Sequence, residues 1–357
     1  MRPFEPHPLL RNAHAMTIAA GLIRRRVPAL PPAQARLFEV EPASTNRPGT
    51  RLRGEAHWQP CLPAGRPDRL KNPVLILVHG LEGSSESSYM LGIAEKAFRA
   101  GFNVIRMNQR NCGGTENLTP TLYNSGLSGD YAAILRELID RDGFAEVFFC
   151  GYSMGGNLLL KMAGELGDSV PPQLKAVGVV CPALDLAAGA NAISEPRNFL
   201  YQWRFVGSLK ARARRKAALF PGAIQLDGLE KVRTIRDFDD RITAPHFGFR
   251  DAADYYFRAS ALRCVSRVSV PTFLLAAKDD PIVPYASLCV PAVLENPRIT
   301  LELTERGGHC GYISRLPAAA GWLAAGRFWA EARLVEFFLT HSSLYAAGQI
   351  GPASGTQ

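Results

Sequence analysis

A serine stands between glycines at the end of a short apolar run, in the stretch VFFCGYSMGGNLLLKMAGEL at residues 147–166. The apolar run predicts a buried strand, and the residues after the glycines space their apolar side chains as a helix does. Gly151, Ser153 and Gly155 fit G-x-S-x-G, which is typical of a sharp strand-to-helix turn that exposes the serine above the sheet edge. The alternative is a serine that caps a helix in a glycine-rich turn, because five-residue motifs recur by chance.

Apolar strands alternate with helical patterns along most of the chain. The runs that predict strands lie at 35–40, 51–58, 74–78, 103–107, 147–150, 176–181, 272–277 and 300–304. Apolar residues at helical spacing lie between several of them, as at 89–100 and 130–141. This alternation predicts an α/β fold with a mostly parallel central sheet flanked by helices.

One long segment interrupts the alternation. Residues 182–268 show no good strand pattern, and they are too many for a connection and too apolar for disorder. We therefore expect a helical cap inserted into one domain that spans residues 35–341 and closes with an amphipathic helix at 325–341. Residues 1–34 are expected to pack on this core as an extension, and residues 342–357 to form a flexible tail.

Two groups of residues in the cap bear on its contacts. A basic run is interpreted as a solvated helix face, with contact to anionic lipid as the alternative; it comprises Lys210, Arg212, Arg214, Arg215 and Lys216. The candidates for lining an acyl channel are the aromatic residues Phe199, Tyr201, Trp203, Phe205, Tyr255 and Tyr256. We expect only a minority of these aromatic side chains to face substrate, since the cap must bury most of them in its own core.

Composition excludes several kinds of site. The chain of 357 residues has a formal net charge of +9, but no stretch pairs basic residues with stacking aromatics, so we predict no nucleic-acid binding. The seven cysteines are odd in number and form no C-x-x-C pair, which favours a reducing, cytoplasmic location over a disulfide framework. No His/Cys spacing resembles a zinc site, and we predict neither a metal nor a cofactor.

The N-terminal apolar run MTIAAGLI at residues 16–23 does not resemble a signal peptide, because the charges follow it. Its length is too short to span a bilayer. We expect a packed segment, and weak peripheral contact with a membrane surface is the alternative. Neither the charge nor the patterning indicates an oligomeric state.

Acidic and histidine residues follow later predicted strands, in the order that a serine nucleophile requires. A nucleophilic serine needs a base within hydrogen-bond reach and an acid that orients the base. The loop AAKDDPIVP carries Asp279 and Asp280, and ERGGHCGY carries His309. The order Ser153, Asp280, His309 is the one found in hydrolases with a G-x-S-x-G turn. Asp279 is interpreted as a partner of nearby backbone donors, and Asp185 as a cap of the insertion.

Acyl transfer also needs donors for the oxyanion. The expected donors are the backbone N–H of Met154, after the nucleophile, and of Leu81, in the loop HGLEG after the strand at 74–78. His79 in the same loop is an alternative base. We interpret it as a residue that stabilises the loop.

Seven blocks of the sequence, in order, resemble the YheT-like branch of the α/β-hydrolases, the AB-hydrolase-4 group. They are HPLLRNAHAMTI, HGLEGSSESSY, NQRNCGGTENLTPTLYNSGLSGD, GYSMGGN, FDDRITAP, DDPIVP and GGHCGY, between about residues 4 and 340. The resemblance implies an α/β-hydrolase fold and a triad of Ser153, Asp280 and His309. The chain has Asn111 and Asn124 where the family usually has the glycine of RGCGGT and the histidine of YHSG.

The resemblance further implies hydrolysis of carboxylic esters, with short- to medium-chain acyl groups or glycerides as small-molecule substrates. Acyl transfer to an alcohol is a second hypothesis, because the same triad serves either acceptor. A third is an inactive hydrolase fold that binds lipid or protein.

Overall fold

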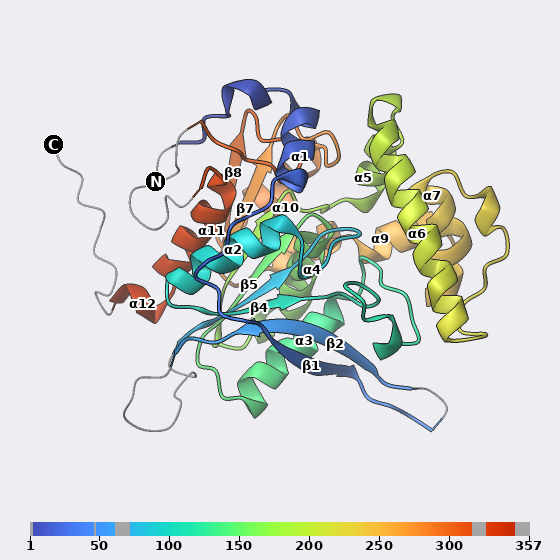
Figure 1. Cartoon of the computed structure of the whole chain (residues 1–357), viewed down its shortest axis with the longest axis horizontal. Helices are drawn as coiled ribbons and strands as arrows, with labels where there is room; N and C mark the ends of the chain where they lie inside the picture. Colours follow the sequence, from blue (N-terminus) through green and yellow to red (C-terminus); the bar gives the residue numbers. More distant parts are fainter. Residues whose placement is uncertain (1–2, 46–47, 61–71, 316–325, 347–357) are drawn as a thin grey trace.

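One sheet of eight strands carries the described part of the chain, and its strand order is β1-β2-β4-β3-β5-β6-β7-β8. The computed structural model describes residues 3–45, 48–60, 72–315 and 326–346 (Figure 1). The strands are β1 (Gln34–Glu41), β2 (Thr50–His57), β3 (Val74–Val78), β4 (Asn103–Met107), β5 (Val147–Tyr152), β6 (Leu174–Val180), β7 (Thr272–Ala277) and β8 (Ile299–Thr304). Each of the eight predicted strands is present, with ends that differ by at most a few residues.

Strand direction follows the predicted pattern. The strands from β3 to β8 pair in parallel, whereas β1 and β2 run antiparallel at one edge. All five residues of β3 are buried, as expected for a strand covered on both faces. The sheet is therefore mostly parallel, and the carboxyl ends of β3 and β5 to β8 lie along one edge, where open α/β sheets bind ligands.

Helices cover both faces of the sheet (Figure 1). On one face, α2 (Ser88–Arg99) and α11 (Trp329–Thr340) pack with alternate strand residues such as Leu75 and Phe148. On the other, α3 (Ser128–Arg136) and α4 (Met154–Leu166) pack with the intervening residues Ile76 and Phe149. Because successive strand side chains point to opposite faces, each strand supplies both layers of the core.

Between β6 and β7 the chain forms helices and no strand. The main ones are α5 (Leu186–Ile193), α6 (Phe199–Leu219) and α9 (Ala252–Ala259), with the short helices α7 (Ile235–Phe238) and α8 (Ala244–Phe247). Apolar residues of this segment such as Val206, Leu209, Phe238 and Ile242 belong to a cluster distinct from the two that flank the sheet, and those of α9 pack with α5 in a further cluster. In Figure 1, α6 and α7 lie to one side of the sheet. These helices lie within residues 182–268, the segment in which the sequence analysis expects a cap.

The ends of the chain are described in part. Helix α1 (Ala13–Leu22) packs near α2, and α10 (Pro291–Leu294) precedes β8. Of the predicted tail, Ser343–Ala346 form α12, whereas residues 347–357 lie outside the described residues. Among the described helices, none combines the length and apolar character needed to cross a bilayer.

The prediction of a solvated basic face on the cap is wrong for two of its residues. Arg212 and Lys216 are 7% and 0% exposed, whereas Arg214 and Arg215 face solvent. The Lys216 ammonium donates hydrogen bonds to the backbone carbonyls of Glu116 and Thr119. One side of α6 packs against the loop after β4, so the cations on that side meet main-chain oxygens instead of water.

Candidate active site

Ser153 occupies a strained turn between β5 and α4. Its backbone has φ 53° and ψ −117°, a conformation that residues with a side chain rarely adopt. The turn is held because the N–H of Ser153 donates to the Val180 carbonyl at 2.9 Å, and the Ser153 carbonyl accepts from Asn157 at 3.1 Å. The strand-to-helix turn that the G-x-S-x-G pattern predicts is therefore present.

Two glycines make this turn possible through close backbone contacts. A Cβ on Gly155 would lie 2.5 Å from the Val78 carbonyl oxygen, at the end of β3. A Cβ on Gly151 would lie 2.6 Å from the carbonyl oxygen of Gly155 itself. Such distances are well inside van der Waals contact, and backbone cannot move aside as a flexible side chain can. The first turn of α4 therefore packs directly on β3.

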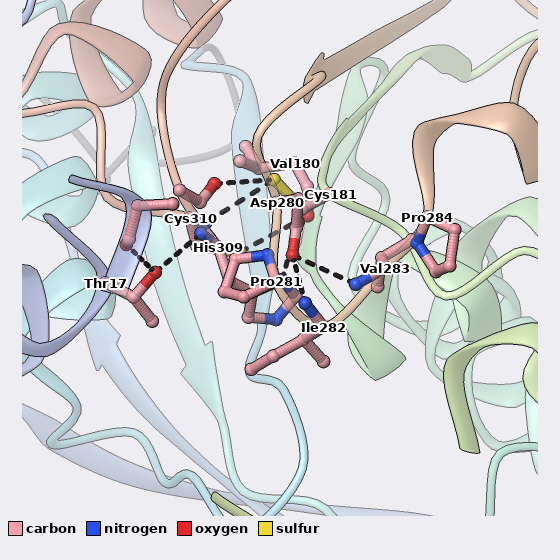
Figure 2. A network of polar contacts seen from close by, with 12 residues as sticks. Thr17, Val180, Cys181, Asp280, Pro281, Ile282, Val283, Pro284, His309 and Cys310 are labelled. Atoms are coloured by element: carbon pink, nitrogen blue, oxygen red, sulfur yellow. Dashed lines mark hydrogen bonds and ion pairs between the residues drawn. The ribbon is translucent and has the colours of Figure 1, made fainter. Parts of the chain in front are cut away.

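His309 and Asp280 form a hydrogen-bonded pair (Figure 2). The Nδ1 atom of His309 lies 2.8 Å from Asp280 Oδ2. The second oxygen, Oδ1, accepts from the backbone N–H groups of Ile282 and Val283 at 2.8 and 2.9 Å. The Asp280 side chain is 2% exposed and the His309 side chain 12%. The carboxylate is therefore fixed by backbone donors and directed at the imidazole.

The electrostatics of this pair favour a protonated imidazole. Burial by itself would lower the pKa of His309, but the charge and hydrogen bond of Asp280 outweigh it and raise that pKa above its ordinary value of 6.5. The hydrogen bond also assigns the ring proton to Nδ1 in the neutral form. Nε2 is then the ring nitrogen that can accept a proton.

The other two candidate acids have the structural roles expected of them. Asp279 Oδ1 accepts from the backbone N–H of Gly308 at 2.9 Å. Asp185 caps α5 by accepting from the N–H of Ala188 at 3.1 Å. The structure thus pairs His309 with Asp280, while the other two carboxylates bind main-chain donors.

His79 is engaged on both ring nitrogens, in line with its interpretation as a loop residue. Nδ1 lies 2.8 Å from the Gly80 carbonyl, and Nε2 accepts from the N–H of Gln109 at 3.1 Å. Burial, as the largest effect, lowers the pKa of His79 to about 4, so it stays neutral. The loop lies beside Ser153, since a Cβ on Gly80 would be 3.7 Å from Ser153 Oγ.

The same loop is bound to the cap by a buried ion pair that the sequence analysis missed. Glu82, at φ 57°, accepts two hydrogen bonds from Arg212 of α6, at 2.9 and 3.1 Å. The hydroxyls of Tyr123 and Ser208 also donate to it, the first at 2.6 Å. Burial would raise the pKa of Glu82, but Arg212 and the hydroxyl donors hold it below its ordinary range. Arg212 therefore fixes the residue next to Leu81.

Helix α1 also belongs to the site, although the N-terminal extension was expected only to pack on the core. The Thr17 hydroxyl accepts from the backbone N–H of His309 at 2.8 Å and donates to the Ala13 carbonyl at 2.7 Å. The thioether of Met16 accepts from the N–H of Ile313. The loop that carries His309 is therefore held from outside by an element that begins about 290 residues earlier. A lone threonine on a short helix carries no sequence signal for such a role.

A cavity of about 240 Å³ unites the candidate residues, since Leu81, Ser153, Met154 and His309 all line it. Much of its wall is apolar, and the apolar lining includes Leu186, Ile193, Leu209, Ile235 and Ile282. Of the six candidate cap aromatics, three line the cavity, namely Phe205, Tyr255 and Tyr256. Half of the six candidates therefore line the cavity, which is more than the minority that the sequence analysis predicted. Phe199 and Trp203 instead face solvent, and Tyr201 stacks on His14 of α1.

Comparison with known proteins agrees with this geometry. The family model described as "alpha/beta hydrolase fold" matches residues 73–316 of the chain. The chain belongs to the α/β-hydrolase family. It is 36% identical over 271 residues to YheT of Escherichia coli (strain K12), a match that covers 75% of this chain and 77% of YheT. The resemblance to the YheT-like branch is thereby confirmed.

Two further relatives carry names that describe lipid hydrolases. The phospholipase ABHD3 of Mus musculus is 30% identical over 69% of this chain, which spans 60% of that protein. The monoacylglycerol lipase of Saccharomyces cerevisiae is 29% identical over 88% of this chain and 70% of its own length. With the fold, these matches make this α/β-hydrolase an esterase- or lipase-like enzyme that hydrolyses esters.

The contact between α4 and β3 can be tested by adding one methyl group. Gly155→Ala should lower the free energy of unfolding by about 1–3 kcal/mol or more, because the new Cβ meets the Val78 carbonyl. Gly129→Ala in α3 is the matched control, since its Cβ would meet nothing within 4 Å. That control should gain roughly 0.5–1 kcal/mol from helix propensity. Urea unfolding measures both; equal stabilities for the two variants would contradict the packing described.

The buried ion pair between loop and cap predicts a large loss when one partner is removed. Arg212→Met should lower the free energy of unfolding by about 3–5 kcal/mol, because the Glu82 carboxylate stays buried without its cation. Arg214→Met, on the exposed side of α6, should change it by less than about 0.5 kcal/mol. Urea unfolding of both variants measures the difference, and similar midpoints would show that the pair contributes little.

Proposed function

We propose that the protein is a serine carboxylic-ester hydrolase in which Ser153 is the nucleophile, His309 the base and Asp280 the orienting acid. The main support is one observation: His309, which is hydrogen-bonded to Asp280, lines the same cavity as Ser153, a serine on a strained strand-to-helix turn. A serine that only capped a helix would need neither a strained backbone nor a neighbouring buried acid and base.

The proposed reaction proceeds through an acyl-enzyme. Nε2 of His309 accepts the proton as Ser153 Oγ attacks the acyl carbon, and the resulting imidazolium is stabilised by Asp280. His309 then returns the proton to the leaving alcohol. In the second half of the reaction, water attacks the acyl-enzyme with His309 again as base, and Ser153 is restored.

The negative charge that develops on the acyl oxygen needs donors beside Ser153. The proposed donors are the backbone N–H groups of Leu81 and Met154. Support comes from their places in the fold, because Met154 begins α4 and Leu81 follows Gly80, which closely approaches Ser153. The hydrogen bonds from Arg212 to Glu82 would then keep the Leu81 donor in place.

The proposed substrates are esters with short- to medium-chain acyl groups, or glycerides. The apolar wall of the cavity suits an acyl chain, since each buried methylene contributes about 0.8 kcal/mol. The name of the yeast relative, a monoacylglycerol lipase, points to the same class of substrate. A series of p-nitrophenyl esters from acetate to palmitate tests this, and a maximum rate at palmitate would contradict it.

Removing the nucleophile should abolish most turnover. Ser153→Ala should lower kcat by roughly 10⁴–10⁶-fold. The slow turnover that remains would come from substrate binding and the oxyanion donors. The variant should fold normally, because alanine fits the turn. A fluorophosphonate probe should label the wild type and fail to label the variant. Hydrolysis at the wild-type rate in Ser153→Ala would refute the mechanism.

The three candidate acids can be separated on one ester. Asp280→Asn should lower kcat by up to about 10⁴-fold, because asparagine keeps the shape but favours the wrong tautomer of His309. Asp279→Asn and Asp185→Asn, whose carboxylates bind backbone donors, should lose far less. The largest loss at Asp185 would move the acid to the end of β6.

The same variants have a distinct signature in the pH profile. Because the base must be neutral and Asp280 raises the pKa of His309, the acidic limb of kcat/KM should lie above pH 6.5 in the wild type. In Asp280→Asn the limb should move to lower pH, while Asp279→Asn should leave it nearly in place. An unchanged limb in Asp280→Asn would show that this carboxylate does not act on the base.

A further inference from the structure

Two cysteines lie against the proposed base, and the ester-hydrolysis mechanism uses neither of them. Cys181 directly follows β6, and Cys310 directly follows His309 in the loop after β8. One ring nitrogen of His309 and the two Sγ atoms all lie within 4.8 Å of one another. Figure 2 shows this cluster beside Asp280. A thiol, a second thiol and an imidazole thus converge from two separate strand ends.

The backbone conformations of the two cysteines, and a hydrogen bond between them, place the two thiols close together. Cys181 has φ 45° and Cys310 has φ 59°, in the left-handed region that favours glycine. Such conformations cost free energy and persist where the surroundings enforce them, often at functional sites. The N–H of Cys310 also donates to Cys181 Sγ at 3.4 Å. The pair is therefore a built arrangement, with both sulfurs turned to the same space.

The cluster can be reached from the substrate cavity. Cys310 and His309 line that cavity, whereas Cys181 lies behind them and is fully buried. A small ion that enters the cavity would meet Cys310 and His309 first. Of the two thiols, only that of Cys310 belongs to a residue of the cavity wall.

The three donor atoms favour a particular class of metal ion. Two thiolates and an imidazole are ligands of zinc-type cations, which they bind tetrahedrally at about 2.3 Å for sulfur and 2.0–2.1 Å for nitrogen. In that geometry, neighbouring ligand atoms lie roughly 3.5–3.8 Å apart. The cluster meets this requirement after shifts of about 1 Å or less. The fourth ligand would be water, because His309 and Cys310 line the substrate cavity.

We propose that Cys181, Cys310 and His309 form an inhibitory site for one zinc-type divalent cation. On binding, the cation displaces the two thiol protons to solvent and is coordinated by a lone pair of the neutral imidazole. Coordination of Nε2 occupies the lone pair that accepts the Ser153 proton, and coordination of Nδ1 breaks the hydrogen bond to Asp280. Either mode removes His309 from proton transfer. The inhibitory effect, though not the binding site, rests on the proposed function.

Zinc inhibition of the full-length enzyme tests the effect. Ester hydrolysis is followed in buffered Zn²⁺ with a phosphine reductant throughout, so that thiol oxidation plays no part. Each variant is compared with its own zinc-free rate. Cys310→Ser should raise the zinc concentration for half-inhibition by more than about tenfold, since even the loss of an outer-shell partner costs that much. Cys289→Ser, at a half-buried cysteine outside the cluster, should match the wild type.

A chelator should restore the activity of the inhibited wild type. Half-inhibition at the same zinc concentration in Cys310→Ser and the wild type would overturn the proposal. So would inhibition that a chelator fails to reverse.

Cobalt binding tests the site without any need for activity. Co²⁺ is added to Ser153→Ala, in which the proposed nucleophile is absent, and the sulfur-to-metal charge-transfer absorption is recorded. The band should be present in this variant. When Cys181→Ser or Cys310→Ser is added, the apparent affinity for Co²⁺ should fall by more than about tenfold. No thiolate band would overturn the metal site and leave the proposed hydrolysis intact. A band in Ser153→Ala together with a wild type that hydrolyses no ester would refute the proposed function alone.

Discussion

The close contact between the first turn of α4 and the end of β3 is the constraint on which the site depends. Gly155 packs against the Val78 carbonyl at a distance that no Cβ permits. This contact places Ser153 beside the loop that starts at His79, because β3 and β5 are neighbouring parallel strands. The candidate nucleophile and the candidate oxyanion loop are thus brought together by backbone packing alone.

Buried polar groups connect α4 and the loop after β3 to the cap. Asn157, on α4, donates to the carbonyls of Ser125 and Ala259 at 2.9 and 3.0 Å, and Ala259 ends α9 of the cap. Arg212 makes a second connection through Glu82. Leaving buried polar groups of this kind unpaired costs free energy, so the cap and the loops of the candidate active site stabilise each other's positions. The cap helps to shape the site as well as to cover it.

Local pattern was sufficient for much of this architecture. The eight strands and the turn at Ser153 follow from apolar runs and short spacings that act within a few residues. The errors concern side chains whose environment is set by distant elements. Arg212 and Lys216 are residue types usually found on a solvated helix face. Here their side chains donate hydrogen bonds to backbone carbonyls, and Arg212 also binds Glu82, because α6 packs against the loops that carry these acceptors. No pattern in the sequence around Thr17 predicts that its hydroxyl binds the backbone N–H of His309.

By itself, the sequence determined which segments become strands and helices, the order in which serine, acid and histidine appear, and the family. Those properties depend on the periodicity of side chains and on backbone conformations that nearby residues decide. The tertiary structure alone decided that Cys181 meets His309 and Cys310, that α1 holds the histidine loop, and that the cap reaches Glu82. These pairs are about 130 to 290 residues apart. Cys181 and His309 meet because β6 and β8 lie on either side of β7 and all three parallel strands end at the same edge of the sheet, whereas α1 and α6 reach that edge by packing against the loops there.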